Sequence, residues 1–567
     1  MPALIHPCLP NGTDRPAGAP DSASKTLPRS PVFCAAVNRP RHSGRQPAAR
    51  RGSILLAVLV LVAVMTIGGL SYFEWTNVER RASTAFLRQT QALAAAESGA
   101  EYLRVYLANE PASIEQQGGL FENPNQFRGL LLSDSTAAAL RSRVSLLAPH
   151  LDSLGNPSGY RFGLENESAR INLNTILLAD EYVENGAREM LTALPGVTDS
   201  IADAILDWID EDDEPRPFGA ELSYYSTLTP SYAPPNRPLE SIDQLLLVRD
   251  VTESLLYGLD RDRNFVIDSQ EAIGLLPEEV DNTDGSANRG LAGYLTLFSA
   301  ERNLNSNGDP RIDVNQEDLE TLHTEIERVL GREAANFIVA FRQGGPEPEG
   351  NRPGEAAGPA ANTESAANLQ IDFETPGSEP ISSLLSLVGV NTSTTAANSD
   401  QRVVVETPFP NRPGELSTFL PDLFDNLTVN SDEVIPGRVN INQAPRAVLE
   451  GLPGMPPEVI DLIVSTRDFE PDSTRPGRQQ GTWLLTEGIV DLEGMQELEP
   501  FVTGGGNVYR TQAIGFFDAE GGAARVQVVI DATGETPVLR RRKELTPLGV
   551  GLSAEQLGGV AALSLAP

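Results

Sequence analysis

Apolar residues are most concentrated near the N-terminus, where residues 53–73 contain no charged side chain. A helix of about 20 apolar residues is long enough to span a bilayer. Three basic residues, Arg45, Arg50 and Arg51, precede the stretch and place that side in the cytoplasm. A buried core helix is the alternative, but aromatic residues of the kind that line a membrane interface follow the stretch, namely Tyr72, Phe73 and Trp75. The pattern therefore predicts a membrane span with the remaining chain outside.

The helical pattern continues beyond the apolar stretch. Residues 75–108 are rich in Ala, Leu, Glu, Arg and Gln, which are good helix formers, and they contain no proline. One long helix over residues 53–110, half in lipid and half outside, is the simplest reading of both segments.

A short alternation of apolar and polar residues recurs three times in the body, at residues 170–174, 311–315 and 438–442. The alternation predicts a short extended segment, and its closing Asn is suited to cap a following helix. Each copy precedes a tight turn between helical patterns, at residues 194–197, 329–331 and 452–455. A stretch rich in Gly, Pro, Ala and Glu, residues 343–368, reads as a linker between two helical domains, 166–342 and 369–500.

The Leu-Pro-Gly turns at residues 194–196 and 452–454 resemble helix-hairpin-helix motifs, which often present main-chain amides to a DNA phosphate. The chain, however, has 43 Lys and Arg against 78 Asp and Glu, a net charge of −35. Asp203, Asp207 and Asp210 share one helical face after the first turn. An acidic body repels phosphate backbones, so we expect no nucleic acid as partner and a structural role for these turns.

The segment Arg50-Arg51-Gly52-Ser53 before the apolar run resembles a type IV prepilin cleavage signal. That resemblance implies that a prepilin peptidase cuts between Gly52 and Ser53 and that the new N-terminus is methylated. An ordinary secretory signal would need a small-residue cleavage site after the apolar run, where the helix instead continues. Residues 1–52 then form a leader, disordered by composition, that is removed.

The fifth residue after this cleavage point is Ala57, where most pilins carry Glu. In pilins that carboxylate offsets the terminal amine of a neighbouring subunit inside the membrane, where unpaired charge is costly. Minor pseudopilins of the K type typically lack it, because a subunit at the tip has no neighbour above it to neutralise.

An ordered set of motifs makes the resemblance specific. It runs Asp207-Trp208-Ile209-Asp210, Gly219-Ala220-Glu221, Tyr224-Tyr225, Asn236-Arg237-Pro238-Leu239, Ser241-Ile242-Asp243-Gln244-Leu245 and residues 440–445. The chain closely resembles the general secretion pathway protein K (GspK) family, the K-type minor pseudopilins of the type II secretion system. The resemblance spans most of residues 50–500.

The resemblance implies an α+β fold: an N-terminal transmembrane pilin helix, and a small pilin-like α/β sheet domain with a large inserted α-helical region of SAM-like or helix-hairpin-helix modules. Strand patterns at 160–163, 508–517, 525–530 and 537–543, with a turn at 520–522, agree with a sheet that starts before the insertion and ends after it. The predicted regions are 1–52, 53–110, 111–165 (first part of the pilin domain), 166–342, 343–368, 369–500, 501–545 (C-terminal pilin strands) and 546–567 (tail).

The family also implies function. It places such a subunit at the tip of the pseudopilus, in support of protein export across the outer membrane, with its anchor in the inner membrane and its body in the periplasm. The implied partners are the I- and J-type minor pseudopilins, the major pseudopilin, the prepilin peptidase and secreted cargo. The alternatives are a membrane-anchored DNA-uptake protein that uses its hairpins and a surface adhesin.

Residues 260–271 have the spacing of an EF-hand calcium loop. Oxygen donors fall at loop positions one, three, five, seven, nine and twelve: Asp260, Asp262, Asn264, the carbonyl of Val266, Asp268 and Glu271. Phe265 stands where Gly normally permits the sharp turn, and an acidic surface loop is the alternative. We expect calcium here. The acidic segment 210–214 with Glu221 is a second candidate, for which a solvated loop is the simpler interpretation.

Catalytic motifs for serine hydrolysis, nucleotide binding or zinc proteolysis do not occur, and both cysteines, Cys8 and Cys34, lie in the leader. The sequence therefore predicts a protein that is not an enzyme.

Overall fold

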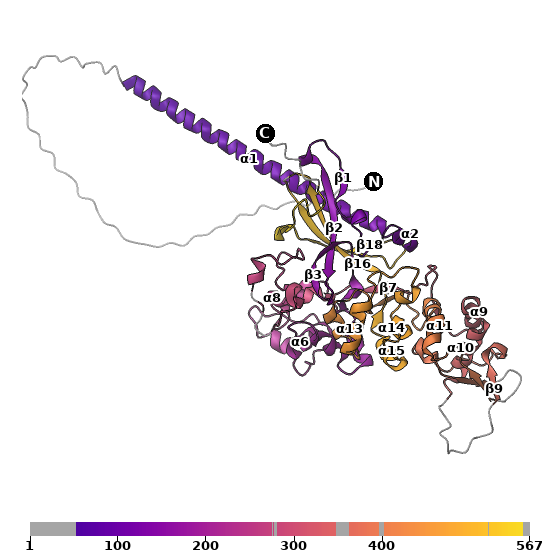
Figure 1. Cartoon of the computed structure of the whole chain (residues 1–567). Coiled ribbons are helices and arrows are strands. Elements are labelled where there is room, and N and C mark those ends of the chain that lie inside the picture. The colour runs from indigo at the N-terminus through magenta and orange to yellow at the C-terminus, as the bar shows by residue number, and fades with distance from the viewer. Residues whose placement is uncertain are drawn as a thin grey trace, which may run out of the picture. The chain divides into compact units, whose positions relative to one another are not determined.

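The computed structural model describes residues 53–274, 276, 280–347, 362–395, 402–519 and 521–559. The chain divides into two compact units, Met1–Thr76 and Asn77–Pro567. Helix α1 (Ser53–Tyr106) begins in the first and ends in the second (Figure 1). In the first unit it exposes a continuous set of large apolar side chains from Ile54 to Trp75. Among the described residues it is the one helix long and apolar enough to cross a membrane, with a peak mean hydropathy of 2.7.

The second unit contains a seven-stranded sheet whose main path runs β1-β2-β16-β17-β18, with β3 paired to β2 and β4 to β16. Its strands are β1 (Leu130–Ser133), β2 (Ser142–Leu151), β3 (Pro157–Phe162), β4 (Glu165–Asn166), β16 (Val508–Phe517), β17 (Ala524–Asp531) and β18 (Val538–Glu544). The sheet thus starts before the helical region and ends after it. The predicted fold class, α+β with a long apolar N-terminal helix and a sheet domain, is confirmed.

Helix α1 packs its small residues against this sheet. Ala96, Ala100 and Leu103 share a core with Val144 and Val528, together with other members of β2, β16 and β17. The approach is close, because a Cβ on Gly515 would lie 2.1 Å from the carbonyl oxygen of Ala92. Small residues at the crossing therefore set the contact between helix and sheet.

The inserted region contains three segments, each of which is closed by a short pair of parallel strands. Each repeat starts with a two-residue strand that pairs in parallel with a second one far along the chain: β5 (Ile171–Asn172) with β6 (Leu295–Thr296), β8 (Ile312–Asp313) with β12 (Leu427–Thr428), and β14 (Val439–Asn440) with β15 (Val502–Thr503). We call the segments 171–296, 312–428 and 439–503 modules 1, 2 and 3. These pairings divide the chain differently from the predicted boundaries, since module 2 starts before residue 342. The boundaries themselves stay a prediction.

Helices are the main regular elements of the modules. Module 1 contains α4 (Ala179–Tyr182), α5 (Gly186–Thr192), α6 (Asp199–Ile209), α7 (Leu222–Tyr225) and α8 (Glu253–Tyr257). Module 2 contains α9 (Leu319–Leu330), α10 (Arg332–Gly344), α11 (Pro413–Asn426) and the strands β9 (Asn362–Ser365), β10 (Thr392–Thr395) and β11 (Arg402–Glu406). Module 3 contains α12 (Arg446–Glu450), α13 (Pro457–Thr466), α14 (Trp483–Thr486) and α15 (Leu492–Leu498). The remaining elements are α2 (Pro111–Gln116), α3 (Pro124–Phe127), β7 (Ala300–Arg302) and β13 (Val434–Pro436).

The closing Asn of each repeat does not cap a helix, contrary to expectation. Asn174 instead exchanges two hydrogen bonds with the main chain of Leu239, 2.7 and 3.0 Å long, and Asn315 does the same with Ile381 at 2.8 and 2.9 Å. Asn442 donates to the carbonyls of Arg478 and Gly504, both at 2.8 Å. The side-chain amide therefore fastens the start of each module to a distant segment.

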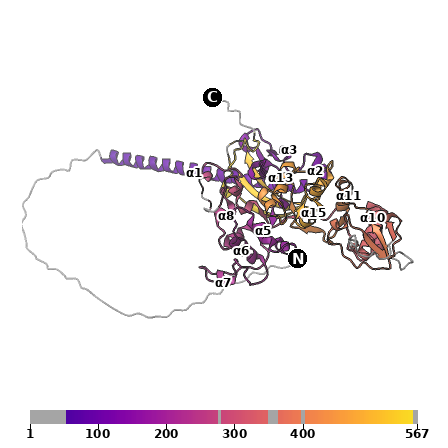
Figure 2. The ribbon, with the colours of Figure 1, turned by 60° about the horizontal axis from the view of Figure 1, so that its bottom comes forward.

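The helix pairs α5–α6, α9–α10 and α12–α13 follow these repeats, and one continuous apolar core runs through all three modules. In both views α13 and α15 lie between the helices of module 1 and those of module 2 (Figures 1 and 2). Module 3 therefore joins the other two.

Candidate metal centre

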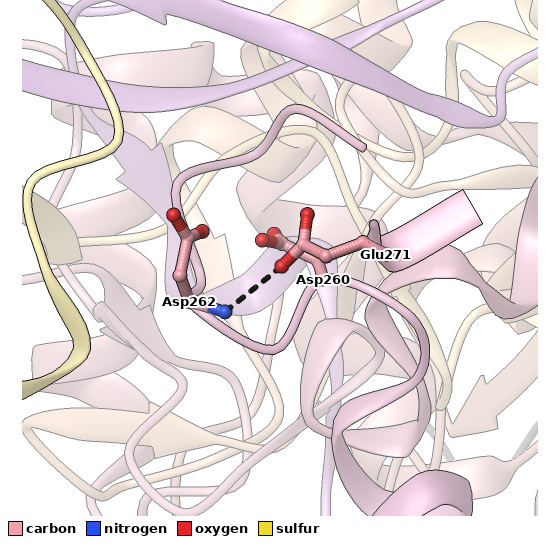
Figure 3. A group of neighbouring side chains, drawn as sticks. All are labelled: Asp260, Asp262 and Glu271. Atoms are coloured by element: carbon pink, nitrogen blue, oxygen red, sulfur yellow. Dashed lines mark hydrogen bonds between the residues drawn. The ribbon is translucent and has the colours of Figure 1, made fainter. Parts of the chain in front are cut away.

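The predicted calcium loop follows α8 directly and ends in a single turn of 3-10 helix (Glu271–Ile273). Asp260 and Glu271 are buried, at 3% and 7% exposure, and Asp262 is half-buried. One carboxylate oxygen from each of the three lies within 4.8 Å of the others (Figure 3). The loop thus brings together the first, second and last acidic positions of the predicted set.

These carboxylates accept hydrogen bonds from the loop's own main chain. Asp260 accepts the N–H groups of Asn264 and Phe265, both at 2.9 Å. Glu271 accepts the N–H group of Asp262 at 3.1 Å (Figure 3) and that of Asp268 at 3.2 Å. The last residue of the loop therefore folds back over its start.

Phe265 makes the turn that glycine normally makes, with a φ of 72°. A left-handed conformation at a bulky residue costs roughly 1–3 kcal/mol and persists only where packing imposes it. Here the ring packs beside Leu147, Phe516 and other apolar residues of the sheet domain, and the Arg289 guanidinium lies 5.2 Å from its centre. The non-glycine residue therefore does not prevent the loop from closing.

The other three predicted ligands make local contacts. The side-chain oxygen of Asn264 accepts the N–H of Val266 at 2.7 Å, and its amide donates to Asp262 at 2.9 Å. Asp268 accepts the N–H groups of Gln270 and Glu271, at 2.7 and 2.9 Å. Their part in metal binding stays a prediction.

The cluster carries concentrated negative charge. Burial raises the pKa of Asp260 to about 6, with a further contribution from Asp262, while Arg289 and the loop amides oppose the rise. Burial, together with the charge of Glu271, also raises the pKa of Asp262. A divalent cation bound between these groups would relieve both effects, because it favours the ionised carboxylates.

The loop is fastened to the sheet by residues that sequence reasoning missed. The buried guanidinium of Arg525, on β17, donates to the carbonyls of Asp262 and Arg263. Gln512, on β16, donates to the Arg263 carbonyl at 2.9 Å. Both lie some 250 residues away in the chain, and no local pattern around them signals the contact. The loop consequently links module 1 to the sheet.

The second acidic candidate is built differently. Asp207 and Asp210 both pair with Arg216, and Asp203 pairs with Arg188. Asp203 and Asp207 are fully buried, so this acidic face of the helix is covered by cations. Residues 211–214 of the candidate segment are exposed, as the interpretation as a solvated loop expects. Glu221 is buried nearby, and burial with the charges of Asp207 and Asp210 raises its pKa to about 7. Within the described ranges, residues 260–271 hold the one group of three close carboxylates.

Comparisons with known proteins concern the part of the chain that leads into the loop. No curated protein matches the chain. Among solved structures, a chain of "The Crystal Structure of the GspK-GspI-GspJ complex from enterotoxigenic Escherichia coli Type 2 Secretion System" is similar at 11% identity, covering 82% of this chain and 99% of that one. Its TM-score is 0.34, a likeness on which we rest no argument. Residues 169–261 match the family model described as type II secretion system (T2SS), protein K. This matched region, which ends within the candidate metal loop, is similar to the protein K family of type II secretion systems.

Proposed function

We propose that this protein is a minor pseudopilin, that it sits at the tip of the type II secretion pseudopilus, and that it supports protein export across the outer membrane. The observation that carries the proposal is the position of the helical modules: they are inserted between β4 and β16 of a sheet that packs on α1. Close-packed pilin-like subunits leave little lateral room, so a protomer with such an insertion fits only where nothing stacks above it.

The chemistry of the chain supports the rest of the proposal. The apolar start of α1 fits a single-pass anchor in the inner membrane, with the body in the periplasm and with processing between Gly52 and Ser53 by the prepilin peptidase. Gly52 lies outside the described residues, and Ser53 is the first residue of α1. The match to the protein K family model supports the I- and J-type minor pseudopilins and the major pseudopilin as neighbours, and a structural rather than enzymatic role.

A deletion tests the steric idea. Asn166 and Tyr509 are paired across β4 and β16, so a two-residue Asn-Gly turn can replace residues 167–508. The core between α1 and the sheet draws no buried residue from the deleted segment, and Arg510 keeps Glu165 as cross-strand partner.

Cells that assemble pseudopili from the major pseudopilin would then be compared by filament length, with the intact chain or the deletion variant. We expect longer filaments with the variant, because subunits could add past it. The capping proposal fails if the variant reaches the membrane in normal amounts and filament length is unchanged.

We also propose that the loop formed by residues 260–271 binds calcium. Hard carboxylate oxygens from Asp260, Asp262 and Glu271 are the ligands this ion prefers, and the loop already brings them together. The metal would then hold module 1 against the sheet, since the same loop accepts the hydrogen bonds of Arg525 and Gln512.

A further inference from the structure

A cavity of about 610 Å³ lies where the three modules meet. Each module contributes apolar residues to its wall: Ile176 and Met190 from module 1, Leu384 and Phe424 from module 2, and Met495 and Phe501 from module 3. Ligand sites in proteins typically enclose roughly 300–1,000 Å³ with apolar walls and a few polar groups. The size and the wall both fit that description.

One cation in the wall has no carboxylate partner. Arg311, just before β8, donates from Nε to the carbonyl of Asp425 at 3.2 Å. Within the described part of the chain its two terminal nitrogens make no hydrogen bond and no carboxylate lies within 4.0 Å of it. Burial lowers the pKa of Arg311, which means that its charge is poorly solvated. Such a fork suits a planar carboxylate, which it can bind through two parallel hydrogen bonds.

Three other charged groups of the wall are already engaged. Arg438 lies 2.5 Å from Glu301, whose second oxygen accepts the Thr503 hydroxyl at 2.8 Å. The carboxylate of Glu499 accepts the hydroxyl of Ser383, and burial raises the pKa of Glu499. A second lone pair on Glu499 remains for a ligand N–H group.

We propose that this cavity binds the C-terminal residue of a polypeptide that ends in an apolar side chain. The α-carboxylate pairs with Arg311, the side chain fills the apolar wall, and Glu499 is available to accept an N–H group of the peptide. Three acidic residues of the wall, Glu301, Asp432 and Glu499, disfavour a phosphate dianion. They favour a single negative charge with a hydrogen-bond donor beside it. The site is independent of where the subunit stands in a pseudopilus.

Fluorescence anisotropy on the full chain in detergent tests the site. The probes are fluorescein-labelled pentapeptides of the sequence Gly-Ser-Gly-Ala-X, in which X is Leu, Phe or Val. Each is used as the free acid and as the C-terminal amide. We expect at least one free acid to bind, and its amide to bind at least about tenfold more weakly, because a charge-assisted hydrogen bond is lost.

Arg311→Gln should abolish the difference between acid and amide. Arg412→Gln, at an exposed arginine outside the cavity, should preserve it. Ser382→Trp, at an exposed position on the cavity rim, should block both probes without disturbing the core. Three results would each overturn the proposal. They are equal binding of acid and amide, binding that survives in Arg311→Gln and Ser382→Trp, and no binding tighter than about 1 mM.

Discussion

At the residue scale, Asp260 is the residue through which the proposed calcium loop can be tested, because it is the most buried of the three carboxylates. A ligand that binds only the folded state stabilises it by about 2.7 kcal/mol at one hundred times its dissociation constant. We therefore expect millimolar calcium to raise the melting temperature of the wild-type chain over that in chelator. Asp260→Asn should lose most of this shift, whereas Asp309→Asn, at an exposed position outside the loop, should keep it. A wild-type chain that melts identically with and without calcium would rule the site out.

The pKa of Asp260 gives the same loop a pH dependence. Its folded value of about 6 lies above the ordinary value of about 3.9, so its contribution to stability is greatest below pH 3.9 and is lost as pH rises through 6. Calcium needs the ionised form and competes with this proton. The calcium-induced rise in melting temperature should therefore be larger at pH 7.5 than at pH 5. An equal rise at both values would show that Asp260 is not a ligand.

At the scale of elements, buried ion pairs connect the sheet to module 1. Arg170, just before β5, pairs with Glu165 on β4, while Arg510 on β16 pairs with Glu167. Burial alone would raise the pKa of Glu165, yet Arg170 and Arg289 hold it at about 2. Glu165 is therefore charged at all ordinary pH values and depends on these cations.

Arg170→Met should accordingly destabilise the chain by roughly 3–5 kcal/mol, reduced in part by Arg289, which lies 3.7 Å from Glu165. Replacing both partners, with Arg170→Met and Glu165→Leu, should recover most of the loss because no buried charge is left unpaired. Urea denaturation of the three proteins provides the measurement. Equal destabilisation by the single and double variants would mean that packing rather than charge holds this junction.

Some of these elements could be predicted from the sequence and others could not. The bounds of β16 at residues 508–517 agree with its pattern, and the EF-hand spacing identified three carboxylates that the structure brings together. Strand β2 escaped prediction because it is buried on both faces over most of its length, so its residues do not alternate. The partners of the three repeats also escaped, since parallel pairing of β5 with β6 joins residues more than 120 positions apart. Local pattern predicts an extended segment but not what it pairs with.

At the scale of the whole molecule, the alanine at position 57 in the first unit is relevant to where the subunit lies in the filament. Ala57 lies in the apolar part of α1, in the place where a shaft subunit would carry Glu for its neighbour's amine. At the tip an introduced carboxylate has no such partner, and an unpaired charge in a membrane helix is costly, up to roughly 2.5–3.5 kcal/mol at the helix centre.

Ala57→Glu should therefore reduce the amount of chain cross-linked to the I-type pseudopilin. Ala63→Glu, six residues further along the same exposed apolar helix, should reduce it at least as much, because both carboxylates are unpaired in lipid and Ala63 lies nearer the centre of the span. Quantitative cross-linking in membranes, normalised to the inserted chain, measures both. A different outcome would contradict the tip position: Ala57→Glu assembles as well as wild type or better, while Ala63→Glu does not. The carboxylate at position 57 would then pair with the terminal amine of a neighbouring subunit, and the subunit would lie within the shaft rather than at its end.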